Sequence, residues 1–161
     1  MTAPLPDEVP ETVRYYLDRI RRLLDRIGAE PDTARLLSIR LAPDMFDTGF
    51  HLAVAIRFAA RALCPPAGLD VPEIPEEIDR GTLAEFGTAV AHLTAPIRAT
   101  DLVQPVNHRA GEARLVQDPA DYVLRFALPN MLFHLSLAHA GLRHGGMAIG
   151  KADFDGLHRY P

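Results

Sequence analysis

The chain has 161 residues, enough for one domain over residues 1–161 that buries a hydrophobic core without disulfides or structural metals. Its formal net charge of −4 argues against a broad phosphate-binding surface and against a nucleic-acid partner. With one cysteine, no signal-peptide pattern and no apolar run of ~20 residues, we expect a cytoplasmic protein without a membrane partner.

The first predicted helix covers residues 10–27, where apolar side chains recur at three- and four-residue spacing. Gly28 is a natural stop for this helix because glycine readily adopts the backbone conformation that ends one. A short amphipathic helical turn follows within residues 31–41, and either Asp32 or Thr33 is expected to cap it.

The second long helix is predicted to begin near residues 42–46 and to end at Cys64, since the two prolines that follow forbid its continuation. Between residues 48 and 56 it carries no charge and is apolar around most of its circumference, which indicates burial on several sides. Cys64 is expected to be a buried, unreactive thiol, because no general base lies near it. Residues 65–81 are rich in proline and are predicted to form an extended connector.

The second half of the chain is predicted to contain two further helices separated by a hairpin. The third helix spans residues 82–95, and two short β-favouring stretches within 102–117 flank a polar centre that contains glycine. The fourth helix begins with Asp118 as its N-cap and ends at the glycine pair 145–146. These elements predict an all-α fold, a four-helix bundle with a small hairpin before its last helix.

The fourth helix contains three histidines at intervals of five residues, His134, His139 and His144. Because a helix advances by about 100° per residue, this spacing does not keep the three side chains on one face. His139 has polar neighbours on its face and is expected to point to solvent, whereas His144 suits the negative end of the helix dipole. Only His134 lies on a mostly apolar face, which it shares with Asn130.

His51, on the buried second helix, is a possible partner of Asn130 and His134. Two histidines and an amide directed into one bundle core can form part of the ligand set of a divalent zinc or nickel ion. The set has no carboxylate and no third imidazole, so such a site would be unusual and weak. Two interpretations therefore stay open: a ligand or metal site at these residues, or two hydrogen-bonded core histidines without a ligand.

Three separated stretches carry a family resemblance: RLAPDMF at 40–46, FALPNMLFH at 126–134 and LRHGGMAIGKADFDG at 142–156. Together and in this order they resemble the uncharacterised bacterial family DUF1993, which belongs to the DinB-like, YfiT-like superfamily of four-helix bundles. The likeness spans nearly the whole chain. It implies an up-down-down-up bundle with a long connection between the second and third helices, and it implies a homodimer.

The resemblance also implies a site, because the wider superfamily includes metal-dependent thiol transferases and hydrolases. Their divalent metal is held by one histidine on the second helix and by an HxxxH pair on the fourth. His51 matches the first position and His134 the last, but Asn130 stands where a histidine is expected, and an amide oxygen is a poorer ligand for zinc or nickel than imidazole.

The function expected from these residues is a small polar pocket between helices around His51, Asn130 and His134. We expect this pocket to bind a small molecule, with at most a weak or vestigial divalent metal site, zinc or nickel, at His51 and His134. Two alternatives remain: a metal-free homodimeric interaction protein without catalytic activity, and a metal-dependent thiol transferase or hydrolase.

Overall fold

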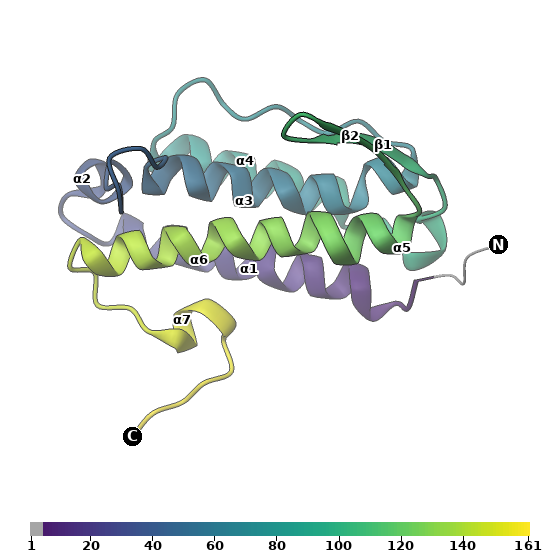
Figure 1. The fold of residues 1–161 in the computed structure, drawn as a ribbon. Coiled ribbons are helices and arrows are strands. Elements are labelled where there is room, and N and C mark those ends of the chain that lie inside the picture. Colours follow the sequence, from purple (N-terminus) through teal and green to yellow (C-terminus); the bar gives the residue numbers. More distant parts are fainter. Residues whose placement is uncertain (1–4) are drawn as a thin grey trace.

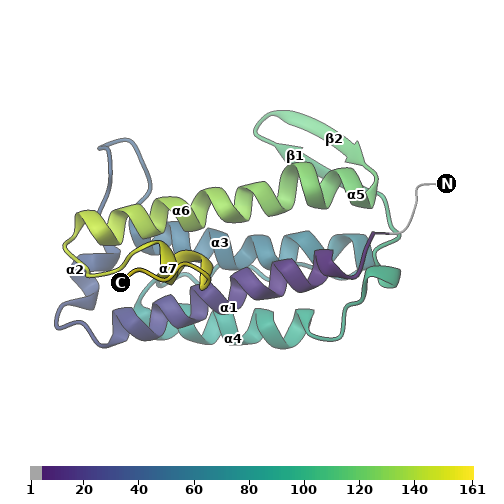
Figure 2. The same cartoon turned by 90° about the horizontal axis from the view of Figure 1, so that it is seen from below.

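A computed structural model describes residues 5–161 and contains four long helices that lie side by side (Figure 1). These helices are α1 (Glu8–Gly28), α3 (Thr48–Leu63), α4 (Arg80–Thr94) and α6 (Leu128–His144). Helices α1 and α6 run in one direction along the bundle, and α3 and α4 run in the other (Figures 1 and 2). The predicted up-down-down-up four-helix bundle is therefore confirmed.

Shorter elements join and cover the long helices. Helix α2 (Thr33–Leu37) follows α1, and the 3-10 turn η1 (Pro65–Ala67) follows α3 before an irregular connector runs back along the bundle. A second 3-10 turn, η2 (Ala99–Asp101), follows α4. After α6 the chain turns and places helix α7 (Lys151–Asp155) against α1 (Figure 2). None of the helices in the described part of the chain is long and apolar enough to cross a membrane.

Two predicted helix starts differ from the observed ones, by two residues for α4 and by up to six for α3, and side-chain caps explain both differences. Helix α3 begins at Thr48, because the carboxylate of Asp47 accepts a hydrogen bond from the backbone N–H of Phe50 at 2.8 Å. Residues 42–46, predicted as the start of this helix, form turns instead. Helix α4 begins at Arg80, because Asp79 and Thr82 form a reciprocal capping box.

The hairpin and the fourth helix follow the prediction closely, with one unforeseen turn. Strands β1 (Val106–Ala110) and β2 (Ala113–Gln117) pair antiparallel. The last helix starts as α5 (Pro119–Tyr122), widens into the π-helical turn η3 (Val123–Ala127) and continues as α6. Pro129 has no N–H to donate to the preceding turn, which is the kind of position where a helix departs from regular α geometry.

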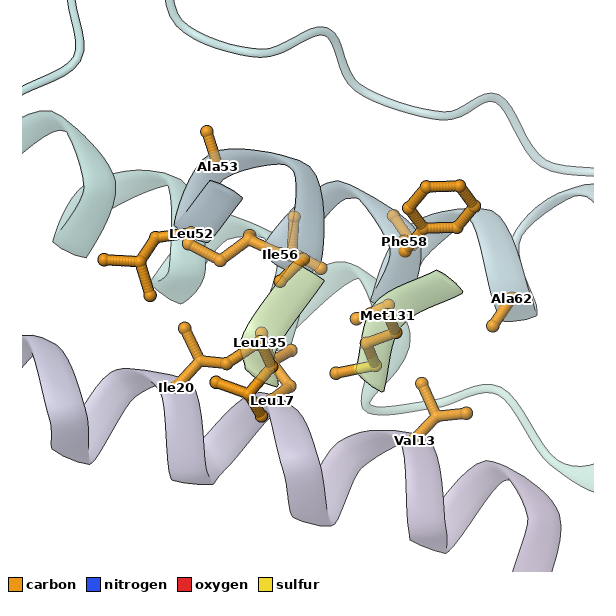
Figure 3. Packing of buried hydrophobic residues seen from close by; sticks show 14 of the residues in the cluster. Val13, Leu17, Ile20, Leu52, Ala53, Ile56, Phe58, Ala62, Met131 and Leu135 are labelled. Carbon is orange, nitrogen blue, oxygen red and sulfur yellow. The ribbon is translucent and has the colours of Figure 1, made fainter. Parts of the chain in front are cut away.

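The core lies among the four long helices, and Figure 3 shows the part of it where α1, α3 and α6 meet. Helix α3 is buried on several sides, as predicted, and its many alanines let neighbouring helices approach closely. Cys64, at its end, is fully buried, and burial raises the pKa of its thiol to about 11, so it is an unreactive core residue as predicted. Side chains at the centre of this core include Leu17, Ile20, Leu52, Ile56, Met131 and Leu135, all at most 1% exposed.

Helices α3 and α6 approach closely at Gly141. A Cβ atom on Gly141 would lie 2.3 Å from the hydroxyl oxygen of Thr48, which is closer than real Cβ contacts allow. Thr48 is 1% exposed, and its hydroxyl donates a hydrogen bond to the carbonyl of Ile39 at 3.0 Å. Since burial and this hydrogen bond hold Thr48 in place, position 141 requires glycine.

We expect Gly141→Ala to lower the free energy of unfolding by about 1–3 kcal/mol, because the added methyl group forces α3 and α6 apart. This loss outweighs the ~1 kcal/mol by which alanine is ordinarily favoured over glycine inside a helix. Urea denaturation measures the change. Gly150→Ala is the control, because a Cβ there meets no atom within 4 Å. A Gly141→Ala variant as stable as the wild type would contradict the close approach.

Candidate functional site

His51 and His134 meet at the contact between α3 and α6. His51 lies in the first turn of α3 and His134 in the middle of the antiparallel helix α6. Their Nδ1 atoms are 2.9 Å apart, and their ring centroids are 5.1 Å apart. His51 is only 5% exposed, whereas His134 is half-buried. The structure thus joins two side chains that are 83 residues apart in the sequence.

The hydrogen bond between the two Nδ1 atoms fixes opposite tautomers on the two rings. One Nδ1 must carry the proton and donate, while the other must accept with its lone pair. The ring that donates therefore has a free acceptor at Nε2, and the other ring has an N–H donor there. The Nε2 atom of His51 is buried and has no hydrogen-bond partner among residues 5–161.

Both imidazoles are neutral at pH 7 because burial disfavours the charged form. Burial, with a smaller contribution from the neighbouring His51 ring, lowers the pKa of His134 from 6.5 to about 4. Burial also lowers the pKa of His51, although the Asp47 carboxylate acts in the opposite direction. The pair is therefore an uncharged hydrogen-bond donor and acceptor within the largely apolar contact between α3 and α6, which we call the seam.

Asn130 lies one turn before His134 on α6, but its amide nitrogen is engaged elsewhere. The Nδ2 atom donates a hydrogen bond to the carbonyl of Phe126 at 2.7 Å. This bond runs back to the residue four positions earlier, at the junction between η3 and α6. Of the three predicted site residues, the structure joins His51 and His134 directly, and Asn130 bonds the helix backbone.

The donor set does not fit a resident metal with three protein ligands. Two nitrogens bound at about 2.05 Å to one ion, at a right angle, lie about 2.9 Å apart, so the separation of the Nδ1 atoms alone is compatible with a shared ion. A third ligand is the difficulty. The described residues contain no group of three or more His, Cys, Asp or Glu side chains that could hold a metal ion.

Phenylalanines surround the imidazole pair. Phe58, from the next turns of α3, stacks on the His134 ring at a centroid distance of 6.0 Å. On the solvent side, Phe46 lies 6.2 Å from His51 and is 56% exposed, and Phe133 lies 5.2 Å from His134 and is 57% exposed. These two exposed rings were not predicted as site residues. Phe133 precedes His134 in the sequence, but nothing in the local pattern distinguishes it from a core residue.

Comparison with known proteins agrees with this architecture. The sequence profile of the family described as domain of unknown function (DUF1993) matches residues 7–155. The chain belongs to the DUF1993 family. Its structure is similar to the crystal structure of a DinB family member protein from Shewanella denitrificans, with a TM-score of 0.79 over 94% of this chain and 92% of that chain.

The sequence identity to the Shewanella denitrificans protein is 22%, so the likeness shows a shared fold and carries no residue roles to the DUF1993 chain. The DinB-like fold expected from the sequence is thereby confirmed. No match to the chain was found among the curated proteins.

The other two histidines of the last helix in this DUF1993 protein, His139 and His144, lie outside the His51–His134 pair. The prediction that His139 points to solvent was wrong: it is half-buried, and its Nε2 donates to the carbonyl of Gly150 at 2.9 Å. The reason is that the segment after α6 folds back over this face of the helix. His144 is exposed in the last turn of α6, where a basic side chain suits the helix dipole.

The lowered pKa of His134 predicts a pH-dependent stability. The folded protein keeps His134 neutral down to pH ~4, whereas the unfolded chain protonates it near pH 6.5. The free energy of unfolding is therefore highest above pH 6.5. It falls by on the order of 2–3 kcal/mol as the pH falls toward 4, because the unfolded chain binds a proton at His134 that the folded protein does not bind. Urea denaturation at a series of pH values measures this slope.

His134→Gln is expected to flatten the slope, because glutamine does not titrate. His144→Gln is the matched control on the same helix, since His144 is exposed, and it should keep the wild-type pH dependence. Equal slopes for His134→Gln and the wild type would show that burial of His134 is not what makes the stability depend on pH.

Proposed function

We propose that this DUF1993 protein binds a small, uncharged polar molecule at the His51–His134 pair. The observation that carries the proposal is the Nδ1–Nδ1 hydrogen bond of 2.9 Å between two neutral rings. It leaves one Nε2 donor and one Nε2 acceptor, and the unpartnered Nε2 of His51 costs free energy until a ligand or water bonds it. A hydroxyl or a carboxamide supplies both complementary groups.

The surroundings favour a ligand with an apolar body beside its polar group. Phe46 and Phe133 are each more than half exposed next to the imidazoles, and Phe58 closes the inner side. An aromatic or aliphatic body packs against such rings with a gain from the removal of apolar surface from water. Because both imidazoles are neutral, a charged group would lose its hydration without an opposite charge to replace it.

In this proposal a divalent metal binds only weakly, at His51 and His134. The amide of Asn130 already donates to a backbone carbonyl, and its oxygen is a poor ligand for zinc or nickel. The metal-dependent thiol-transferase or hydrolase chemistry of the wider superfamily is not proposed, since two imidazoles stand where three would be needed.

A second candidate function is a homodimeric interaction protein, and the exposed phenylalanines favour it. Phe46 and Phe133 are both exposed beside the imidazole pair, and two copies of the chain can bury them against each other. In this alternative the histidines are core residues hydrogen-bonded to each other, and no small molecule binds. The substitution Phe133→Ser separates the two candidates. It should lower the ligand affinity if the protein binds a small molecule, and it should change the oligomeric state if the protein is a homodimeric interaction protein.

Benzamide, which joins a neutral carboxamide to an apolar ring, is the probe that tests ligand binding. We expect it to shift the imidazole NMR resonances of His51 and His134 at pH 7.5, with millimolar affinity. His51→Gln should weaken binding by about tenfold, because it removes one buried hydrogen-bonding nitrogen. His144→Gln, at an exposed position of α6, should leave the affinity unchanged.

Unshifted His51 and His134 resonances at the solubility limit of benzamide would overturn the binding proposal. Light scattering on the same samples addresses the second candidate. A dimer that Phe133→Ser dissociates, together with no response to benzamide, would favour the interaction protein.

Titration with Zn²⁺ tests the metal part. We expect a dissociation constant weaker than about 1 μM, because only two imidazoles converge and structural sites use four ligands. His134→Ala should abolish even this weak binding, and His144→Ala should not change it. Calorimetry on protein dialysed against chelator measures both values, and a dissociation constant in the nanomolar range would contradict the proposal.

A further inference from the structure

Arg61 lies near the C-terminal end of α3, half-buried between two aromatic rings. Its guanidinium carbon is 4.6 Å from the centroid of the Phe58 ring and 5.1 Å from that of Phe126. The two rings are themselves 5.8 Å apart. Cation–π contacts of this kind hold the guanidinium against the rings. The Tyr122 phenol also interacts with this guanidinium through a hydrogen bond, and because a guanidinium has five N–H donors, others remain available to a ligand.

This guanidinium has no negatively charged partner within residues 5–161 at ion-pair distance. Arg57, one turn earlier on α3, provides the contrast. It pairs with the Glu73 carboxylate at 2.9 Å and donates to the carbonyl of Pro72 at 3.1 Å. Partial burial of a charge without a counter-charge costs free energy, and a bound anion would offset this cost at Arg61.

Two other polar side chains near Arg61, Tyr122 and His108, also support a binding site here. Tyr122, 1% exposed, precedes the π-helical turn η3; burial raises the pKa of its phenol, and the nearby Arg61 guanidinium opposes that rise. His108 of β1 packs on Phe126 at 4.2 Å and is 9% exposed. Its Nε2 donates to Gln117 at 2.7 Å, which leaves a buried Nδ1 without a partner. Irregular π-helical turns of this kind often mark functional sites.

We propose that Arg61 binds the carboxylate of a small aromatic or aliphatic acid. One guanidinium supplies one positive charge and a fork of N–H donors, which matches a single carboxylate in charge and in geometry. A dianionic phosphate needs more positive charge than this site offers, because the neighbouring Arg57 is already paired with Glu73. The rings of Phe58 and Phe126 supply apolar surface for the body of the acid. The proposal does not require the imidazole pair to bind anything.

Benzoate is the probe, and benzamide is its uncharged counterpart of nearly the same shape. In the ¹⁵N-labelled full chain, benzoate is expected to shift the Nε–Hε resonance of Arg61 with millimolar affinity, and benzamide is not. Arg61→Gln should weaken benzoate binding by about ten- to a hundredfold, because it removes a charge-assisted bidentate contact. Arg57→Gln, which removes the paired arginine of the same helix, should leave the affinity within about twofold.

Arg61→Lys keeps the charge without the fork and should retain part of the affinity, so the test stands even if Arg61→Gln folds poorly. Circular dichroism checks folding. Unchanged benzoate affinity in both Arg61 variants would overturn the proposal, as would phosphate binding more tightly than benzoate at Arg61. Benzoate shifts confined to His51 and His134 would overturn it as well, and would also contradict the preference of the imidazole pair for uncharged ligands. No benzoate shift at Arg61, together with benzamide shifts at His51 and His134, would overturn it while leaving the proposed function intact.

Discussion

The close contact between α3 and α6 is the constraint on which the rest of this structure depends. Gly141 lets the two helices approach until a Cβ on it would overlap the hydroxyl of Thr48, and the small side chains of α3 keep the helices close farther along. At this separation the rings of His51 and His134 must touch, and their Nδ1 atoms come to 2.9 Å. A wider spacing would open the seam to water and restore an ordinary histidine pKa to both rings.

Burial decides the chemistry that this contact can support. It keeps the imidazoles neutral, so they act as a donor–acceptor pair and not as a cationic site. The Asn130 amide bonds the carbonyl of Phe126, which withdraws its nitrogen from the pair. A fold shared with a DinB family protein does not by itself assign a function, because function resides in the side chains placed on a fold.

The same seam carries a row of rings from the imidazole pair toward the hairpin. Neighbouring centroids along His51, His134, Phe58, Phe126 and His108 lie 4.2 to 6.0 Å apart. Unpartnered buried nitrogens mark both ends of this row, and a guanidinium without a counter-ion lies over two of its members. Unpartnered buried nitrogens on α3 and on β1 thus lie along this row of rings, which supports both proposals for what binds there.

The sequence by itself determined the elements of this protein, because apolar periodicity, prolines and glycines act on their own neighbourhood. They predicted four helices, the extended connector and the hairpin, but they did not place the starts of α3 and α4, which the caps at Asp47 and Asp79 decide. The sequence also singled out His51 and His134. Only the tertiary structure decided their contact, the backbone partner of Asn130 and the burial of His139, because each depends on segments that come together only when the bundle packs.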